Sequence, residues 1–151
     1  MKYLTNGISS THEEIEQSLF KILKMYERYE NQFGLWAAIE KSTSSFIGWF
    51  HFRPCHKEPD NLERIELGYR LRKEFWKKGY ATEGSLALID KGFKEMNVTE
   101  VFATTMKKNL ASQQVMKKAG LSFEKEFHDE RFTNSNELDV IYNLFRDDYL
   151  I

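Results

Sequence analysis

The chain has 151 residues, of which 41% are hydrophobic and 15% aromatic, enough to form the core of one domain. Its 22 Lys and Arg residues nearly balance its 23 Asp and Glu residues, so the formal net charge is −1. This balance argues against a dedicated nucleic-acid binder, because such proteins usually have an excess of basic residues.

The first predicted element is a helix over residues 11–29. Thr11 and Glu14 match the capping-box pattern that often begins a helix. The apolar residues that follow recur at helical spacing, with charged residues between them. They are Ile15, Leu19, Ile22, Tyr26 and Tyr29.

Three strands are predicted next, over residues 35–40, 46–52 and 64–72, from their aromatic and β-branched composition. The first of them is apolar on both faces, so we expect it to be buried. Residues 41–45 are typical of a hairpin turn, and residues 53–62 contain both prolines and are predicted as a surface loop.

The second half of the chain is predicted to contain two helices and three strands. The helices cover residues 81–96 and 110–119, and the strands cover residues 101–105, 123–127 and 138–145. The apolar stripe of the first helix consists of Leu86, Ile89, Phe93 and Met96. Gly120 is suited to end the second helix in a left-handed conformation. This order predicts a single α+β domain over residues 1–151, with a mixed, mostly antiparallel sheet and helices on both faces.

Residues 74–83, with the sequence EFWKKGYATE, are the most informative stretch. A strand ends just before them and a helix starts within them. Gly79 lets a ligand approach the backbone closely, the first N–H groups of a helix attract anions, and Lys77 and Lys78 add positive charge. The stretch therefore predicts a pyrophosphate site. The alternative is an ordinary strand-to-helix turn with solvated lysines.

This stretch resembles the acyl-CoA-binding segment of the GNAT N-acetyltransferase superfamily, whose pattern is Q/R-x-x-G-x-G/A. Trp76 replaces the usual Gln or Arg, as is typical of the branch that resembles the ribosomal-protein-alanine N-acetyltransferases. Three further matches follow in family order, at residues 65–71, 109–121 and 139–149. The resemblance covers most of the chain and implies the GNAT acyltransferase fold.

The resemblance also implies the ligands. The expected co-substrate is acetyl-CoA, the expected acceptor is a primary amine on a protein N-terminus or a small molecule, and no metal is expected. The positions that match the family's cofactor-binding residues are Leu71, Arg72, Lys77, Lys78, Gly79, Tyr80, Ala81, Thr82, Asn109 and Ser112.

Direct acetyl transfer requires a site for the oxyanion, a base for the amine and stabilisation of the departing thiolate. The resemblance implies that the Leu71 N–H faces the thioester carbonyl. Glu66 is the candidate base, and Ser112 and Tyr142 are candidates at the sulfur. Each has a structural alternative: a solvated or salt-bridged carboxylate for Glu66, helix capping for Asn109 and Ser112, and core packing for Tyr142.

A non-catalytic acetyl-CoA-binding module is the alternative to an enzyme. The chain is expected to be a cytoplasmic protein, because it has one cysteine, Cys55, no long apolar run and a polar N-terminus. Neither a nucleic-acid partner nor a membrane partner is expected.

The resemblance implies one further strand and a short helix before the segment that matches residues 1–4. Without that strand, the strand at residues 35–40 lies at an open edge, which invites pairing. We expect residues 1–8, a partner subunit or a crystal neighbour to cover this edge, and therefore a possible homodimer.

Overall fold

The computed structural model describes residues 10–128 and 137–149. Its contacts divide the chain into two compact units, Met1–Gly34 and Leu35–Ile151. The described part of the first unit contains helix α1, His12–Arg28. Thr11 Oγ1 accepts a hydrogen bond from the Glu14 N–H at 3.2 Å, and Glu14 Oε2 accepts one from the Thr11 N–H at 2.8 Å. The predicted capping box is confirmed.

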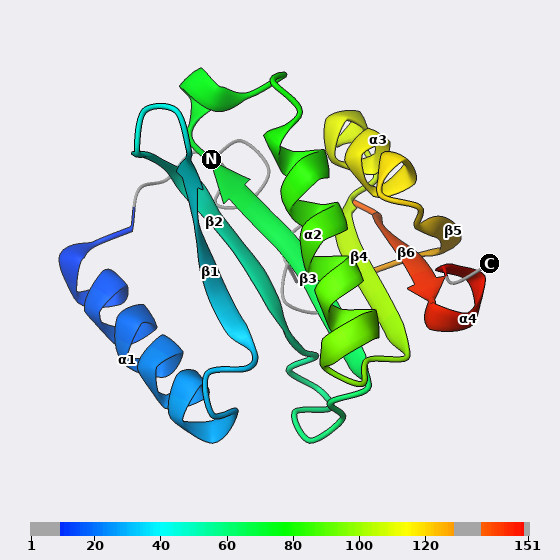
Figure 1. Cartoon of the computed structure of the whole chain (residues 1–151), viewed down its shortest axis with the longest axis horizontal. Coiled ribbons are helices and arrows are strands. Elements are labelled where there is room, and N and C mark those ends of the chain that lie inside the picture. The colour runs from blue at the N-terminus through cyan, green and yellow to red at the C-terminus, as the bar shows by residue number, and fades with distance from the viewer. Residues whose placement is uncertain (1–9, 129–136, 150–151) are drawn as a thin grey trace. The chain divides into compact units, whose positions relative to one another are not determined.

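The second unit is built on a six-stranded sheet with the order β1-β2-β3-β4-β6-β5 (Figure 1). The strands are β1 Gly34–Glu40, β2 Ser45–Pro54, β3 Arg64–Leu71, β4 Glu100–Met106, β5 Ser122–Phe127 and β6 Asp139–Phe145. The helices are η1 Lys73–Phe75, α2 Tyr80–Glu95, α3 Leu110–Lys118 and α4 Arg146–Tyr149. β3 and β4 pair in parallel, whereas the pairs β2–β3, β4–β6 and β5–β6 are antiparallel. The predicted α+β fold, with a mixed and mostly antiparallel sheet, is confirmed.

The predicted burial of the first strand is wrong. β1 is an edge strand of the sheet that the described residues form, and its Ile39 side chain is 51% exposed. An edge strand has a neighbour on one side only, so an apolar sequence there does not ensure burial. Residues 1–8, which were expected to cover this edge, lie outside the described residues, and the homodimer stays a prediction.

Helix α2 packs on the sheet through two glycines. An added Cβ at Gly84 would lie 2.2 Å from the Phe50 ring, and one at Gly92 would lie 2.6 Å from the Phe52 ring. These close approaches define which side of α2 faces the sheet, so Leu88 is buried and Leu86 is 38% exposed. The predicted apolar stripe was wrong at Leu86, because small residues rather than large ones form part of the buried face.

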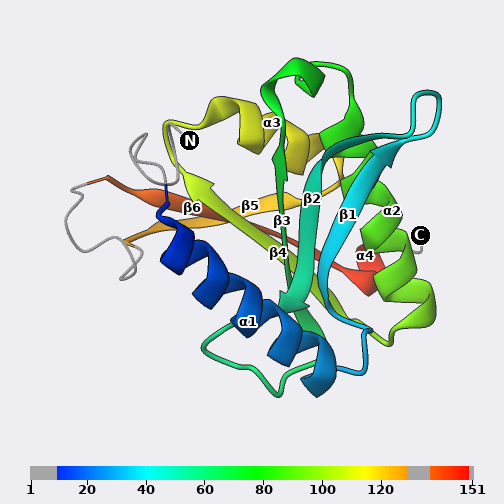
Figure 2. The same ribbon diagram turned by 90° about the vertical axis from the view of Figure 1, so that its left-hand side faces the viewer.

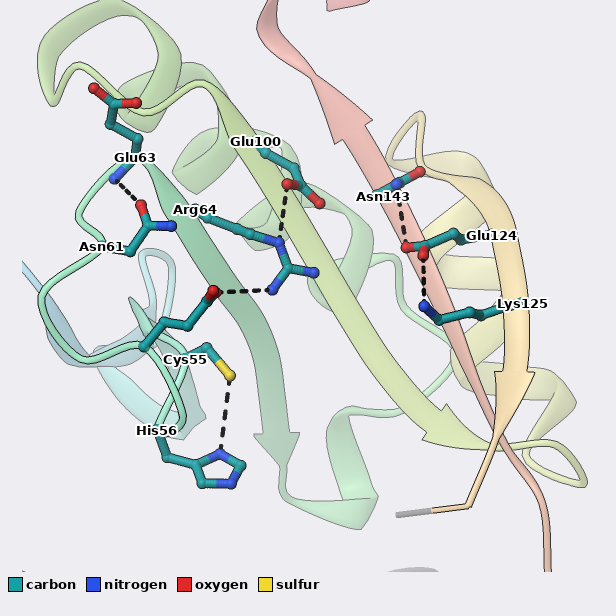
Figure 3. Close-up of polar contacts among 10 residues, drawn as sticks. Cys55, His56, Asn61, Glu63, Arg64, Glu100, Glu124, Lys125 and Asn143 are labelled. Atoms are coloured by element: carbon teal, nitrogen blue, oxygen red, sulfur yellow. Dashed lines mark hydrogen bonds and ion pairs between the residues drawn. The ribbon is translucent and has the colours of Figure 1, made fainter. Parts of the chain in front are cut away.

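β3 and β4 are paired only at one end. The parallel register joins Arg64 with Glu100, Ile65 with Val101, and Glu66 with Phe102. The Arg64 Nε donates to Glu100 Oε2 at 2.9 Å (Figure 3). The Arg64 guanidinium lies 4.1 Å from the centre of the Phe102 ring. These contacts hold the starts of the two strands together.

The C-terminal part matches the predicted pattern. Gly120 follows α3 with φ +91°, and β5 and β6 form the predicted antiparallel pair. On this pair, Asn143 Nδ2 donates to the Glu124 carboxylate at 3.3 Å, and Lys125 lies 3.1 Å from the same carboxylate (Figure 3). The short helix α4 was not predicted.

Gly48 on β2 provides a stability test. Its φ is +145°, and an added Cβ would lie 2.2 Å from the Arg70 carbonyl oxygen, which is backbone and cannot swing away. We expect Gly48→Ala to lower the free energy of unfolding by about 3 kcal/mol or more, from backbone strain plus the clash. Urea denaturation measures this. Gly120→Ala is the matched control, because its Cβ would meet only Leu144 at 3.5 Å, so an equal loss in both variants would contradict the clash.

Candidate active site

The candidate site lies where β3 and β4 separate. Beyond Glu66 and Phe102, no strand pairing joins the remainder of β3 to the remainder of β4 in the described chain. We call residues 67–71 of β3 and 103–106 of β4 the divergent segment, and both views show the two strands moving apart there (Figures 1 and 2). Each strand keeps its other neighbour, since β3 pairs with β2 and β4 pairs with β6. The backbone edges that face the divergent segment are therefore available to a ligand.

Leu71 is the last residue of β3, and its backbone N–H and C=O point toward the side on which β4 lies. The Arg72 N–H donates to the Ile47 carbonyl of β2 at 2.8 Å. Because backbone groups of successive strand residues point to opposite sides, the N–H and C=O of Leu71 point away from β2. The Trp76 indole N–H donates a hydrogen bond to the Leu71 carbonyl oxygen at 2.8 Å. The Leu71 N–H is thus directed into the divergent segment, as the resemblance implies.

The turn before α2 has two residues in left-handed conformation, Lys77 with φ +62° and Gly79 with φ +87°. Gly79 is the N-cap of α2, and no atom lies within 4 Å of the position that its Cβ would take. The open space lies next to the first N–H groups of α2, at Tyr80, Ala81 and Thr82, which have no partners within a helix. These features fit a phosphate group, as the sequence predicts.

The side chains around this turn include cations and one anchored carboxylate. Lys77 and Lys78 are exposed. The Tyr80 hydroxyl donates to the Glu40 carboxylate at the end of β1, and Thr43 Oγ1 donates to it at 2.5 Å. These bonds lower the pKa of Glu40 and raise the pKa of Tyr80. They tie the hairpin after β1 to the start of α2.

Arg72, a predicted cofactor residue, is engaged with the protein. Its Nη1 donates to the Phe46 carbonyl at 3.1 Å, and its Nη2 lies 2.5 Å from Glu74. These contacts fix the chain between β3 and the turn. They assign the guanidinium a structural position, and its contact with a cofactor stays a prediction.

Asn109 caps α3 and anchors it to β4. Its Oδ1 accepts from the Ser112 N–H at 3.3 Å, and its Nδ2 donates to Thr105 Oγ1 at 3.1 Å. Asn109 therefore caps the helix, which was the alternative to a cofactor contact, and the cofactor contact stays a prediction. The cap also places the Ser112 side chain in the first turn of α3, next to the divergent segment.

Tyr69 pairs across the sheet with Phe50, with 5.8 Å between the ring centres. The Phe50 ring meets α2 at Gly84, so Tyr69 lies on the face of the sheet that α2 covers. Burial raises the pKa of Tyr69, and the Ser112 side chain of α3 acts against that rise. Tyr69 therefore faces the helices rather than the side of the sheet on which Glu66 lies.

Glu66 lies on the opposite face of β3 from Tyr69. Its side chain is buried, at 5% exposure for the residue, and its Oε2 lies 3.5 Å from Arg53 Nη2 on β2. The salt-bridged alternative is therefore present, and the base role stays a prediction. On the same face the His51 ring lies over Gly68, where an added Cβ would be 2.3 Å from Cε1.

Tyr142 is placed in the core. It is 3% exposed, its ring packs edge-on against Phe123 at 5.7 Å, and its hydroxyl donates to Gln113 Oε1 at 3.2 Å. Gln113 Nε2 in turn donates to the Lys107 carbonyl at 2.6 Å. The Tyr142 hydroxyl thus supports the start of α3, so the core-packing alternative is present, and the role of Tyr142 at the sulfur stays a prediction.

The described residues contain neither a metal-binding cluster nor a helix suited to span a membrane. No group of three or more His, Cys, Asp or Glu side chains is arranged to hold a metal ion. None of the described helices has the length and apolar character required to cross a membrane.

Comparison with known sequences gives consistent matches. The model of the acetyltransferase (GNAT) domain matches residues 1–122. The FsC-acetyl coenzyme A-N(2)-transacetylase of Aspergillus fumigatus is 30% identical over 125 residues, which cover 78% of this chain and 52% of that protein. The chain therefore spans about half the length of this relative.

Solved structures share the fold. A GNAT-family acetyltransferase from Bacillus anthracis superimposes with a TM-score of 0.79 at 24% identity, covering 97% of this chain and 81% of that one. The ribosomal-protein-S5-alanine acetyltransferase of Vibrio fischeri superimposes with a TM-score of 0.73 at 19% identity, and the match covers 93% of this chain and 78% of that one. The spermidine N-acetyltransferase of Vibrio cholerae, solved in complex with CoA and spermine, superimposes with a TM-score of 0.77 at 16% identity. The match covers 100% of this chain and 85% of that one.

Asn109 provides a test of the cap. We expect Asn109→Ala to lower the free energy of unfolding by about 1 kcal/mol, because Ala cannot accept from the Ser112 N–H. Asn109→Asp keeps an accepting oxygen and is the control. Denaturant unfolding and turnover are measured on the same samples. A loss of stability with full turnover would limit Asn109 to capping, whereas a loss of turnover in a stable variant would place it at the cofactor.

Proposed function

Since the chain belongs to the GNAT acetyltransferase family, we propose that it transfers the acetyl group of acetyl-CoA to a primary amine, on a protein N-terminus or a small molecule. The observation that supports this most directly is the divergent segment. It opens the sheet between the Leu71 N–H and the first turn of α3. A regular sheet would satisfy these groups internally and would have no room for a substrate.

The proposed cofactor site uses the turn before α2. The N–H groups at Gly79 and the first turn of α2 bind the pyrophosphate, with Lys77 and Lys78 nearby, and the side-chain-free space at Gly79 permits the approach. Acetyl-CoA supplies an activated acetyl group. From the turn it extends toward the divergent segment, on the face of the sheet where α2 and α3 pack.

The proposed chemistry uses groups on both faces. The Leu71 N–H donates to the thioester oxygen as negative charge develops there. Ser112 lies at the sulfur, on the side of α3. Glu66 lies on the other face, and it accepts the amine proton directly or through water while Arg53 holds its carboxylate.

The charged side chains on the Glu66 face of the sheet also favour some amine acceptors over others. Arg53 balances the charge of Glu66, and Arg70 adds an exposed cation that stacks on Trp49 at 5.4 Å. No carboxylate among the described residues pairs with Arg70, so Glu66, Arg53 and Arg70 together carry a net positive charge. A polyamine is a polycation that needs a surplus of negative charge. We therefore favour a protein N-terminus or a small amine of low positive charge.

The activity is tested by following CoA release from acetyl-CoA with a panel of acceptors: peptides with different N-termini, amino acids, simple primary amines and spermidine. We expect turnover with at least one primary amine and weaker turnover with spermidine. Product mass, higher by one acetyl group on nitrogen, checks the reaction. Tight acetyl-CoA binding without turnover of any amine would instead support the non-catalytic binding module.

The cofactor site is tested separately with Gly79→Val. The new side chain enters the open space at the start of α2, so we expect acetyl-CoA affinity in calorimetry to fall at least about tenfold. Gly120→Val is the matched control, because it also places a valine at a left-handed position, at the end of α3. Unchanged acetyl-CoA affinity in a folded Gly79→Val variant would show that the pyrophosphate does not bind at this turn.

A further inference from the structure

Arg70 places an exposed positive charge beside the divergent segment. It is the residue before Leu71 on β3, and its side chain is exposed. Because side chains alternate along a strand, Arg70 lies on the same face of the sheet as Glu66, opposite the face on which α2 packs. Under the proposed function this is the face from which the amine approaches.

The Arg70 guanidinium differs from the arginines around it. Arg64 on β3, Arg53 on β2 and Arg72 just after β3 each lie within 3.5 Å of a glutamate. Among the described residues no carboxylate pairs with Arg70, and its guanidinium contacts an aromatic ring instead. Its N–H groups are therefore available to an anion from outside the protein.

Trp49 holds the Arg70 guanidinium in place. The two residues are direct partners in the antiparallel register of β2 and β3, and the guanidinium lies over the Trp49 ring, 5.4 Å from its centre. A guanidinium over an aromatic ring uses its flat side and keeps the N–H groups at its edge free. Those groups match a carboxylate with two parallel hydrogen bonds, and the contact with Trp49 reduces the rotamer freedom lost on binding.

The charges on the Glu66 face determine which anion fits. Glu66 and Arg53 lie 3.5 Å apart and balance each other, so Arg70 leaves one positive charge. Asp139 of β6, two strands away from β3, is buried and already has a partner. One carboxylate neutralises the charge of Arg70. A phosphate monoester carries about −1.5 to −2 at neutral pH, so it would exceed that charge and meet repulsion from Glu66.

We propose that the acceptor carries a carboxylate a few bonds away from its primary amine, and that Arg70 binds this carboxylate. This rests on the proposed function, in which the acetyl carbon lies at the Leu71 N–H. Neighbouring Cα atoms are about 3.8 Å apart, so only a carboxylate close to the amine reaches Arg70 while the amine reaches that carbon. The nitrogen–carbon bond forms, the carbon–sulfur bond breaks with its electron pair on sulfur, and the amine proton leaves toward Glu66. The carboxylate is unchanged by the reaction.

Two sources supply such a carboxylate, and pairs of acceptors distinguish them. A free amino acid has it on the carbon that bears the amine, and is compared with its own amide. A peptide that begins with Asp has it on the first side chain, and is compared with the same peptide beginning with Asn. We expect kcat/KM to be at least about tenfold higher for the acid of at least one pair. Reactivity alone favours the amide, because a nearby carboxylate stabilises the protonated, unreactive amine.

Variants of Arg70 test which residue reads the carboxylate. Arg70→Met should raise KM for the preferred acid at least about tenfold, leave KM for acetyl-CoA unchanged and abolish the acid–amide preference. Arg70→Lys keeps the charge without the planar fork and should retain part of the preference. Arg70→Glu should reverse it, which a loss of folding cannot imitate. Arg146→Met is the matched control, since α4 follows β6 at the end where β3 and β4 are paired, and its preference should equal that of the wild type.

A binding measurement does not depend on turnover. The CoA-bound protein is titrated in a calorimeter with N-acetylglycine, N-acetyl-β-alanine and N-acetylaspartate amide, and with the fully amidated form of each. We expect at least one carboxylate to bind at least about tenfold more tightly than its neutral form, and this difference to disappear in Arg70→Met.

The outcomes separate this inference from the function on which it rests. Acetylation of amines with no preference for acids, a preference that survives in Arg70→Met, or faster turnover of phosphoethanolamine than of β-alanine would overturn the inference and leave the function standing. If Arg70→Met does not fold, the comparison of Arg70→Lys with the wild type decides. A protein that acetylates no amine but loses carboxylate binding in Arg70→Met would remove the proposed function and keep the carboxylate site.

Discussion

The short pairing between β3 and β4 is the constraint on which the rest of the site depends. Three residues of each strand form the parallel ladder, and the Arg64 contacts with Glu100 and Phe102 hold that end. Beyond it the strands cannot satisfy each other's backbone groups, and Trp76 takes the Leu71 carbonyl that a regular ladder would use. The sheet is thus closed at one end and open at the other, and the outer pairings of β3 with β2 and β4 with β6 keep the opening from collapsing.

The helices convert this opening into a site with distinct positions. Close contact of Gly84 and Gly92 with the β2 aromatics fixes the height and rotation of α2, and so fixes where its first N–H groups lie. Asn109 fixes the position of α3 in a similar way, because its side chain forms hydrogen bonds with the Ser112 N–H and with Thr105 of β4. Tertiary packing, rather than helix propensity, therefore sets the distance between the turn before α2 and the start of α3.

Local patterns in the sequence were enough to predict most of the fold. The capping box at Thr11, the turn at Gly79 and the end of α3 at Gly120 each depend on residues a few positions apart, and all three were found. Burial was less predictable, because it depends on neighbours distant in sequence. Residues 35–40 were predicted as a buried strand, yet they form an edge of the sheet. The apolar stripe of α2 was wrong at Leu86, because glycines take part of the buried face.

The same limit applies to the site, and β3 shows why. Alternation along one strand sends Glu66, Gly68 and Arg70 to one face and Leu67, Tyr69 and Leu71 to the other. The sequence predicts this division, but not that the Glu66 carboxylate lies beside Arg53, which is on the neighbouring strand β2. Under the proposed function, one face receives the acceptor and the other the thiol, and the backbone between them receives the oxyanion. A single strand can then separate the incoming amine from the departing sulfur while holding both within reach of one carbonyl carbon, which a site built on one face could not do.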